Sequence, residues 1–242
     1  MSSRRLEILR AIVDEYVSTQ EPVGSKSIAD HHGLGISPAT IRNEMAVLED
    51  EGLITQPHTS AGRIPTDLGY RVFVDKLATV KQLSSAERRA IETFLQGSHD
   101  LEELLKRSAK LLADITKQVA VVTFPIIGEG REKMAISGTA NLARSGEDLG
   151  LTLSPILEAL EEQVILLRLL DEVHSTVHVR IGSEQTEANL QSTSLVTVGY
   201  GGESSQLGAV GVLGPTRMDY AASIAAVDAV ARYVGRFINE GQ

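Results

Sequence analysis

Residues 37–66 read SPATIRNEMAVLEDEGLITQPHTSAGRIPT and place a capped helix, a short apolar run and a Gly/Pro-bounded loop in direct succession. Ser37 is a good N-cap because its hydroxyl can accept from the free amides of the first turn. Pro38 falls at the first helical position, where its missing N–H costs nothing. Gly52 follows the helix at the position where a left-handed residue ends it. This order predicts a recognition helix followed by the wing of a winged helix-turn-helix domain.

An amphipathic helix precedes this stretch and supplies a scaffold for it. Apolar residues recur at helical spacing over residues 6–17, and the sequence EPVG of residues 21–24 ends the pattern. A second short helix is expected over residues 25–31, and the sequence GLG of residues 33–35 turns into the capped helix. Three helices joined by turns of this length are typical of a helix-turn-helix core.

The first turns of the capped helix carry side chains that suit base recognition. The apolar residues of this helix share one face, which leaves Thr40, Arg42 and Asn43 outside it. Arginine can fork onto guanine and asparagine onto adenine, and the N-terminal part of a recognition helix meets the base edges. The residues expected to contact DNA are Lys26, Ser37, Ala39, Thr40, Arg42, Asn43, His58, Thr59, Ser60 and Arg63.

The loop after the capped helix has the composition of a DNA-binding wing. Residues 55–66 hold no acidic residue, and Gly62 would let the backbone come close to a phosphate or a groove. Arg63 can enter a minor groove, where the negative potential favours a guanidinium. The alternative is a polar hairpin without a DNA role, but the position directly after an Arg-Asn helix favours the wing.

Charge indicates a modest DNA binder. The chain has 23 Lys and Arg against 32 Asp and Glu, a net charge of −9, and residues 1–80 hold 8 basic and 11 acidic residues. Because basic residues drive sequence-independent affinity, the cations must cluster on one face to be effective. The cations expected in this cluster are Arg4, Arg5, Lys26, Arg42, Arg63 and Arg71. The acidic residues 49–51 lie at the far end of the recognition helix.

Composition narrows the class of protein. A chain of 242 residues with 42% hydrophobic residues suits about two folded domains. The absence of cysteine excludes disulfides, a thiol nucleophile and a cysteine metal site. The N-terminus has no signal-peptide pattern, and no stretch approaches the about 18 apolar residues of a membrane-spanning helix. A soluble cytoplasmic protein is therefore expected.

The remainder of the chain changes its pattern after residue 117. Residues 67–117 show helical periodicity, with a capping box at residues 84–87, and are expected to form a helical connection. A strand is expected over residues 119–124, ending at Pro125, and further strands over residues 177–181, 194–200 and 208–213. Helices are expected over residues 154–170 and 220–238. Strands flanked by helices, with short turns between consecutive strands, indicate an α+β fold.

Several long motifs, in this order, resemble the HrcA family of heat-inducible transcription repressors. The motifs are PVGSK (22–26), SPATIRN (37–43), PHTSAGRIPT (57–66), GYR (69–71), GTANL (138–142), VRIG (179–182) and GVLGPTRMDY (211–220). The resemblance implies a winged-helix domain followed by a GAF-like domain. It also implies a dimeric repressor that binds an inverted-repeat operator upstream of chaperone operons. The resemblance further implies that the GroE chaperonin supports repression and that misfolded protein diverts the chaperonin under heat stress.

The chain departs from the family in its middle. Members of the family usually hold a long central segment after the strand at residues 119–124, including an inserted dimerising subdomain, and here residues 125–137 bridge the gap. We expect a winged-helix domain over residues 1–78, a helical linker over 79–117 and an apparently incomplete GAF-like domain over 118–242. Missing strands would leave sheet edges exposed. Dimer contacts are then expected on the helices of 67–117 and on the GAF-like half.

Other chemistries find weaker support in the residues. His174 and His178 stand four apart without an acidic residue or cysteine at a helpful offset, so no metal site is predicted. The sequence GPTR of residues 214–217 is predicted to end a strand and cap the final helix, with an anion-binding loop as the alternative. No catalytic constellation or cofactor loop is present, so neither enzyme activity nor a cofactor is predicted. The functional alternative is a ligand-sensing DNA-binding regulator whose GAF-like domain binds a small effector.

Overall fold

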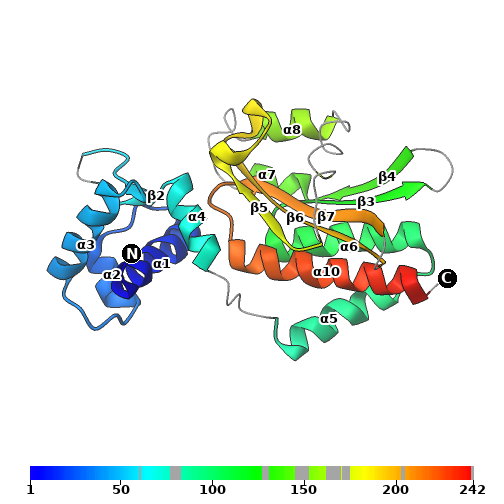
Figure 1. The fold of residues 1–242 in the computed structure, drawn as a ribbon, viewed down its shortest axis with the longest axis horizontal. Helices are drawn as coiled ribbons and strands as arrows, with labels where there is room; N and C mark the ends of the chain where they lie inside the picture. Colours follow the sequence, from blue (N-terminus) through cyan, green and yellow to red (C-terminus); the bar gives the residue numbers. More distant parts are fainter. Residues whose placement is uncertain are drawn as a thin grey trace. The chain divides into compact units, whose positions relative to one another are not determined.

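The computed structural model describes residues 1–59, 61–76, 83–126, 131–144, 153–161, 170, 175–202 and 205–240. The chain divides into two compact units, Met1–Thr79 and Val80–Gln242 (Figure 1). Helices and antiparallel strands make up both units, so the α+β prediction is confirmed. Among the described residues, no helix is both long enough and apolar enough to cross a membrane.

The first unit is a helix-turn-helix followed by a short two-stranded wing. Its elements are α1 (Ser3–Thr19), α2 (Ser25–His31), α3 (Pro38–Asp50), β1 (Ile54–Thr55), β2 (Ile64–Pro65) and α4 (Asp67–Lys76). The two strands pair antiparallel, with Ile54 opposite Pro65. The element order confirms the winged helix-turn-helix prediction.

The beginning of α3 is set by the residues that the sequence indicates. Ser37 Oγ accepts a hydrogen bond from the Thr40 backbone N–H at 3.1 Å, and Pro38 is the first residue of the helix. The cap satisfies one of the four amides that a helix start leaves without an internal partner. The first turn of α3 is therefore ordered by its own sequence.

The end of α3 is a Schellman motif. Gly52 has a φ of 72°, and its N–H donates to the Glu49 carbonyl at 2.9 Å. The Leu53 N–H donates to the Leu48 carbonyl, also at 2.9 Å. Because only glycine adopts this backbone conformation without steric strain, Gly52 ends the helix as predicted and directs the chain into β1.

The hydrophobic core of the first unit draws on every helix and on the wing strands. Its buried side chains are Ile8, Leu9, Ile12, Val13, Ile28, Ile41, Met45, Leu48, Leu53, Ile54, Tyr70 and Phe73. Thr66 Oγ1 accepts from the Gly69 N–H at 3.1 Å and so caps α4. A Cβ atom at Gly69 would lie 2.0 Å from the Leu53 carbonyl oxygen, so a glycine lets α4 approach the chain before β1.

The second unit is an antiparallel five-stranded sheet with helices on both faces. Its helices are α5 (Ser85–Gln96), α6 (Leu101–Thr116), α7 (Thr139–Arg144), α8 (Leu153–Glu161) and α10 (Tyr220–Glu240), with 3₁₀ turns at Gly182–Glu184 and Ala188–Leu190. The strands are β3 (Val119–Ile126), β4 (Arg131–Ser137), β5 (His178–Ile181), β6 (Thr193–Gly202) and β7 (Ser205–Pro215). They lie in the order β4-β3-β7-β6-β5.

The two faces of this sheet are covered by different helices (Figure 1). On one face α10 packs on β6 and β7, and α6 packs on β3 and β4. Ser194 Oγ lies 2.7 Å from Tyr220 Oη of α10 on this face. On the other face, Ile156 and Ala159 of α8 join a buried cluster with sheet residues that include Val121 and Leu195. The sheet is therefore the middle layer of the second unit.

The segment expected only to bridge a gap forms a strand. The strand predicted to end at Pro125 continues to Ile126. β3 pairs with β4 over its last seven residues. β3 pairs with β7 only as far as Val122, and Pro125 lies beyond this part. The missing N–H of Pro125 therefore removes no hydrogen bond to β7. The described strands consequently form one continuous sheet with β4 at its edge, rather than a sheet with an unpaired β3.

Edge strand β4 is tied to α6 by an ion pair. Lys133 Nζ lies 3.1 Å from Glu102 Oε2. Hydrogen bonds from Lys106 and Lys133 hold the pKa of Glu102 below its ordinary value. A lysine on an edge strand also disfavours pairing with a foreign strand. The charge of Lys133 therefore partly protects the exposed edge of β4 against pairing with a strand of another molecule.

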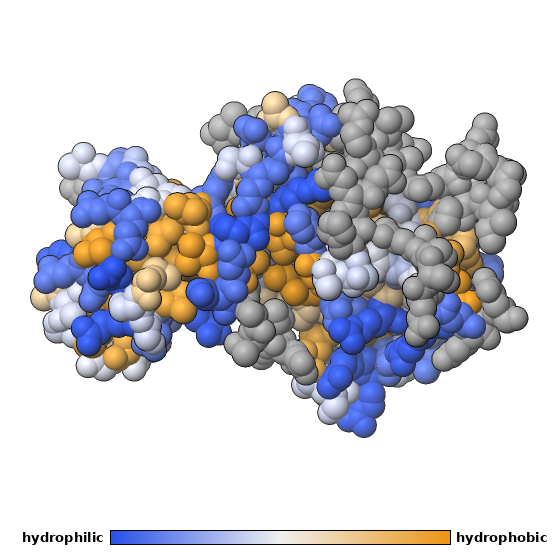
Figure 2. Space-filling model, viewed as in Figure 1, coloured by the Kyte–Doolittle hydropathy of each residue, from blue (hydrophilic) through white to orange (hydrophobic). Residues whose placement is uncertain are grey.

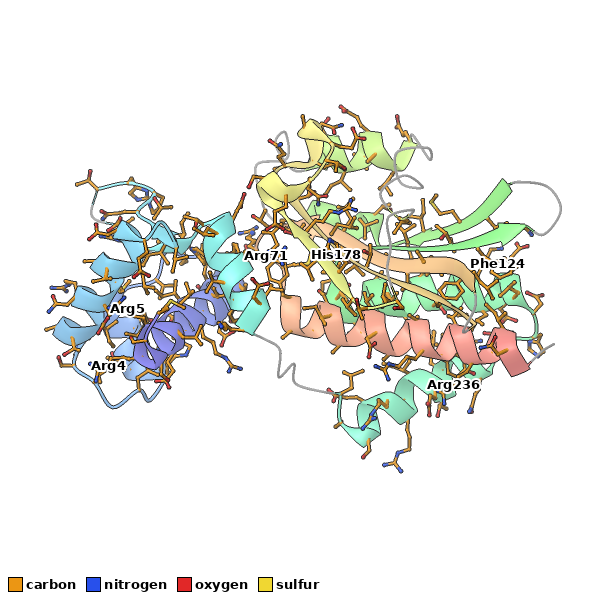
Figure 3. The ribbon with its side chains drawn as sticks, in the orientation of Figure 1. Arg4, Arg5, Arg71, Phe124, His178 and Arg236 are labelled. Carbon is orange, nitrogen blue, oxygen red and sulfur yellow. The ribbon has the colours of Figure 1, made fainter. Side chains whose placement is uncertain are left out.

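The helices expected as a connection between domains pack within the second unit. α5 and α6 lie in that unit and contact α10, and Arg236 of α10 approaches Glu92 of α5 to 2.6 Å (Figure 3). Ser84 caps α5 through the capping box that the sequence indicates. The buried face of α6, with Leu104, Leu105 and Leu112 among its residues, is an integral part of the core.

Candidate nucleic-acid interface

The N-terminal half of α3 presents its polar side chains outward. Ile41 and Met45 are buried, whereas Ala39, Arg42 and Asn43 are exposed. This division follows from the helical period, which turns residues 39, 42 and 43 away from the face that carries 41, 45 and 48. The structure therefore brings three of the expected contact residues of this helix onto one solvent-facing surface.

The two hydroxyl residues expected at this surface also serve the helix itself. Ser37 Oγ lies 3.0 Å from Thr40 Oγ1 and accepts from the Thr40 N–H. Ser37 is exposed and Thr40 half-buried. Because a hydroxyl can both donate and accept, each retains capacity for a further bond while it holds the helix start.

Two cations of the helix-turn-helix remain available. Lys26 is exposed near the start of α2, and Arg42 is exposed on α3. Within the described part of the chain, neither has an ion-pair or hydrogen-bond partner. Both positive charges are therefore free to meet phosphates or base edges without breaking an existing pair.

Other arginines expected in the basic cluster are paired with carboxylates. Arg5 Nε lies 3.0 Å from Glu44 Oε2, and Arg5 Nη1 lies 2.8 Å from Glu51 Oε1. Arg4 is 3.9 Å from Glu44, and Figure 3 labels both arginines at the beginning of α1. Arg71 pairs within α4 with Asp75 at 3.4 Å. Fewer of the six expected cations are therefore free of a carboxylate partner. Arg4 and Arg5 of α1 neutralise acids in and directly after α3 instead of facing DNA.

Arg63 makes the same kind of contact from the wing. Its Nε and Nη2 atoms lie 3.0 and 2.9 Å from Glu49 Oε2 in the last turn of α3. The two side chains are 23% and 34% exposed. A groove contact by Arg63 would require the guanidinium to leave Glu49. Glu49 lies 14 residues away in the chain, so no local sequence signal indicates it as the partner of Arg63.

The wing loop is held together by hydrogen bonds within it. The Ala61 N–H donates to the His58 carbonyl at 3.0 Å, and Gln56 Nε2 donates to the Ala61 carbonyl at 2.9 Å. His58 and Thr59 are exposed at the tip, and Ser60 lies outside the described residues. The structure therefore places two of the expected wing residues in solvent, on a loop closed by a turn.

A glycine is required at position 62 for packing within the protein, whereas the sequence suggested a close approach to DNA. A Cβ atom there would lie 2.5 Å from the carbonyl oxygens of both Pro22 and Val23. The next residue, Arg63, exchanges two backbone hydrogen bonds of 2.9 Å with Val23. The absence of a side chain at Gly62 thus lets the wing base approach the segment between α1 and α2.

The candidate metal and anion sites of the sequence lie in the second unit. In the described part of the chain, no group of three or more His, Asp or Glu side chains is placed to hold a metal, and His174 lies outside that part. At the candidate anion loop, Asp219 Oδ1 accepts from the Ala222 N–H at 2.9 Å. β7 ends at Pro215 and Asp219 caps the start of α10, in keeping with the predicted strand end followed by a helix cap.

Comparisons with known proteins agree with this geometry. The family "Winged helix-turn-helix transcription repressor, HrcA DNA-binding" matches residues 1–78, and the family "HrcA protein C terminal domain" matches residues 126–224. The chain is similar to the "Heat-inducible transcription repressor HrcA" of a Nocardioides species, with 42% identity covering 98% of this chain and 99% of the relative. The protein of the same name from Streptomyces avermitilis is also 42% identical, with 99% of each chain covered.

A solved structure shares the fold of the whole chain. It is titled "Crystal structure of a hypothetical protein at 2.2 A resolution", and it matches with a TM-score of 0.86 and 22% identity over 100% of both chains. The alignments to the two relatives extend over 333 and 336 residues, whereas this chain has 242. The relatives therefore contain internal residues that this chain lacks, as its short middle segment suggests.

Proposed function

Because the chain belongs to the HrcA family of heat-inducible transcription repressors, we propose that it represses heat-shock operons by binding an inverted-repeat operator as a dimer. The observation that carries the proposal is the exposed N-terminal half of α3, where Ala39, Arg42 and Asn43 face solvent on a helix capped at both ends. The relatives are named as transcription repressors, which are regulators and not enzymes. The site of action is the cytoplasm, where bacterial operons lie.

Each exposed residue takes a role that its chemistry suits. Arg42 and Asn43 read base edges in the major groove, since their side chains can form paired hydrogen bonds with guanine and adenine. Ala39 supplies an apolar contact to a thymine methyl group. Lys26 binds a phosphate and fixes the register of the helix.

Polar groups at the edges of this surface position the protein on the backbone of DNA. Ser37 and Thr40 face the start of α3, where hydroxyls and helix N–H groups meet phosphates. His58 and Thr59 reach the neighbouring backbone from the wing tip. Ser60 is assigned to the same wing contact on its sequence position. These contacts set orientation and leave discrimination to the base-reading residues.

A dimer follows from the size of the reading surface. One recognition helix reads only a few base pairs, and a two-fold dimer doubles the site by matching an inverted repeat. We assign the dimer contacts to the helices of residues 67–117 and to the second unit. Leu68 of α4 and Ile115 of α6 are 52% and 39% exposed. Figure 2 shows hydrophobic residues gathered beside α4 on the visible face of the first unit.

The experiment that tests the proposal is a DNA titration. An inverted-repeat duplex is recovered from a random-sequence library by selection with the full chain. Gel-shift titrations then compare this duplex with a scrambled duplex of the same composition, at a fixed salt concentration because phosphate contacts depend on salt. Preference for the inverted repeat supports a sequence-specific repressor. Equal affinity for both duplexes contradicts it.

Replacing Arg42 or Asn43 by alanine should reduce discrimination between the two duplexes by about 1–3 kcal/mol for each residue, because a paired hydrogen bond to a base edge is lost. The measurement is the ratio of the two dissociation constants in the same titration. Arg10→Ala is the matched control, since Arg10 is exposed on α1, outside the proposed DNA and dimer contacts, and its loss changes the charge as in Arg42→Ala. A ratio unchanged in both α3 variants removes these residues from base reading.

The GroE chaperonin is the partner that the proposal adds for regulation. Protein refolded from denaturant should contain a larger fraction able to bind the operator duplex when GroE and ATP are present, because a chaperonin captures exposed apolar surface during folding. An excess of an unrelated unfolded protein should remove this gain by competing for GroE. The fraction is read from gel shifts at saturating DNA. Equal fractions with and without GroE contradict the partnership.

A further inference from the structure

We infer that Arg63 is a positioning residue, which holds the wing against the recognition helix through Glu49. The inference rests on the proposed function, because it concerns the same DNA-binding surface. It changes the role of one residue, since a basic residue in a wing is expected from sequence to reach into a groove. The structure instead aims the Arg63 guanidinium at the last turn of α3.

The geometry of the contact favours a structural role. Both Nε and Nη2 of Arg63 approach one oxygen of Glu49, at 3.0 and 2.9 Å. With exposures of 23% and 34%, the two side chains are half-buried, so water screens them less than a fully exposed pair. An arginine presents these two N–H groups in a fixed planar arrangement, which defines the direction of the contact as well as its charge.

The backbone of the same residue anchors the wing to a second element. The Arg63 N–H and carbonyl group form two hydrogen bonds of 2.9 Å with Val23, between α1 and α2. The other bonds of the loop, from Gln56 and Ala61, are internal to it. Arg63 therefore joins the wing to the segment before α2 by its backbone and to α3 by its side chain. The orientation of the loop tip relative to α3 depends on this residue.

Electrostatics supports the same assignment. Glu49 lies in the last turn of α3, where the helix dipole disfavours a negative charge, and Arg63 neutralises it. A guanidinium that moved to a phosphate would leave this carboxylate without its arginine partner. The acids Glu44 and Glu51 of the same helix segment are likewise neutralised, both by Arg5. Pairing of α3 acids with arginines from flanking elements is thus a repeated feature of this unit.

The first test does not involve DNA. Hydrogen exchange is measured on the full chain for the backbone amides of Val23 and Arg63, which bond across the wing base, and of Ala61, which closes the turn in the loop. Glu49→Gln and Arg63→Gln should each speed exchange of these amides about threefold or more, the scale expected for one partly exposed ion pair. Asp50→Asn is the control, because Asp50 is exposed and the charge change is the same. Equal exchange in wild type and both pair variants overturns the inference.

The second test separates positioning from groove contact in DNA binding. With the selected inverted-repeat duplex, Glu49→Gln should bind about threefold or more weakly than Asp50→Asn, since both remove one negative charge and only the first releases the wing. A groove-contacting Arg63 predicts the opposite, because removal of Glu49 frees its guanidinium. Arg63→Lys should also weaken binding, since lysine keeps the charge but loses the planar pair of donors. Wild-type affinity in Arg63→Lys overturns the positioning role.

The two tests distinguish failure of the inference from failure of the proposed function. If wild type shows no preference for the inverted repeat, the proposed function fails, and the exchange measurement still decides whether Arg63 positions the wing. If Glu49→Gln does not fold, Glu49→Asp replaces it, because the shorter acid keeps the charge and withdraws it from Arg63. Faster exchange in Glu49→Asp than in wild type supports the inference, and unchanged exchange overturns it.

Discussion

A duplex with one half of the inverted repeat scrambled should bind the protein about 100-fold or more weakly than the intact repeat. Each mismatched base pair removes about 1–3 kcal/mol of specific binding, and these losses add for separate positions. Scrambling half of the site removes several pairs together, and the remaining affinity is set by contacts with the DNA backbone. Fluorescence titration gives the dissociation constants, and sedimentation of the complex gives the number of chains per duplex.

Spacing supplies the control for this prediction. Inserting about 5 base pairs between the half-sites turns the second half-site to the opposite side of the DNA helix. Inserting about 10 base pairs returns both half-sites to the same side but increases the distance between them. A dimer with two fixed recognition helices should bind the first insertion as weakly as a half-site. Tight binding of one chain to a single half-site, or indifference to spacing, contradicts the dimer proposal.

Replacing Gly69 by alanine should destabilise the first unit by about 3 kcal/mol, the upper end of the usual cost of overpacking. The added Cβ would lie 2.0 Å from the Leu53 carbonyl oxygen and 3.0 Å from its carbonyl carbon, and backbone atoms cannot rotate away as a flexible side chain can. α4 must therefore move off the chain before β1, and the core around Tyr70 and Phe73 loosens with it. A domain with total stability of about 5–15 kcal/mol loses a large part of it. Chemical denaturation followed by circular dichroism measures the change.

The matched control is the same substitution in open space. A Cβ at Gly24 meets no atom within 4 Å, and the residue is the N-cap of α2 with a φ of −97°. Gly24→Ala should therefore cost about 1 kcal/mol at most, through the weaker capping of alanine. Hydrogen exchange in α1 and α3 assigns any loss to the first unit. Equal stabilities of the two variants would show that α4 has room to adapt.

The paired arginines explain how a mildly acidic unit can serve as a DNA-binding domain. Residues 1–80 hold more acidic than basic residues, which by composition alone opposes DNA affinity. In the structure, Glu44, Glu49 and Glu51 of the α3 region all face arginines. Lys26 and Arg42 remain exposed in this unit, without a carboxylate partner among the described residues. The distribution of charge, and not its sum, decides the field that DNA meets.

The sequence by itself determined the features that depend on a few neighbouring residues. Ser37, Pro38 and Gly52 mark both ends of α3, because a cap bonds to groups within one turn of the helix. The helical period alone placed Arg42 and Asn43 outside the buried face, and the order of helix, strand and loop indicated the winged fold. Local physics suffices where both partners of an interaction lie within one element.

Only the tertiary structure decided the features that join distant residues. β4 forms in a segment with no strong strand pattern because β3 offers it a pairing partner, and β3 passes Pro125 because that end has one neighbouring strand. Gly62 meets Pro22, and Arg63 meets Glu49, because the fold brings their elements together. An exposed arginine can satisfy its charge with water, a phosphate or a carboxylate. The choice among them depends on which group the fold places within about 3 Å, and no local pattern encodes that distance.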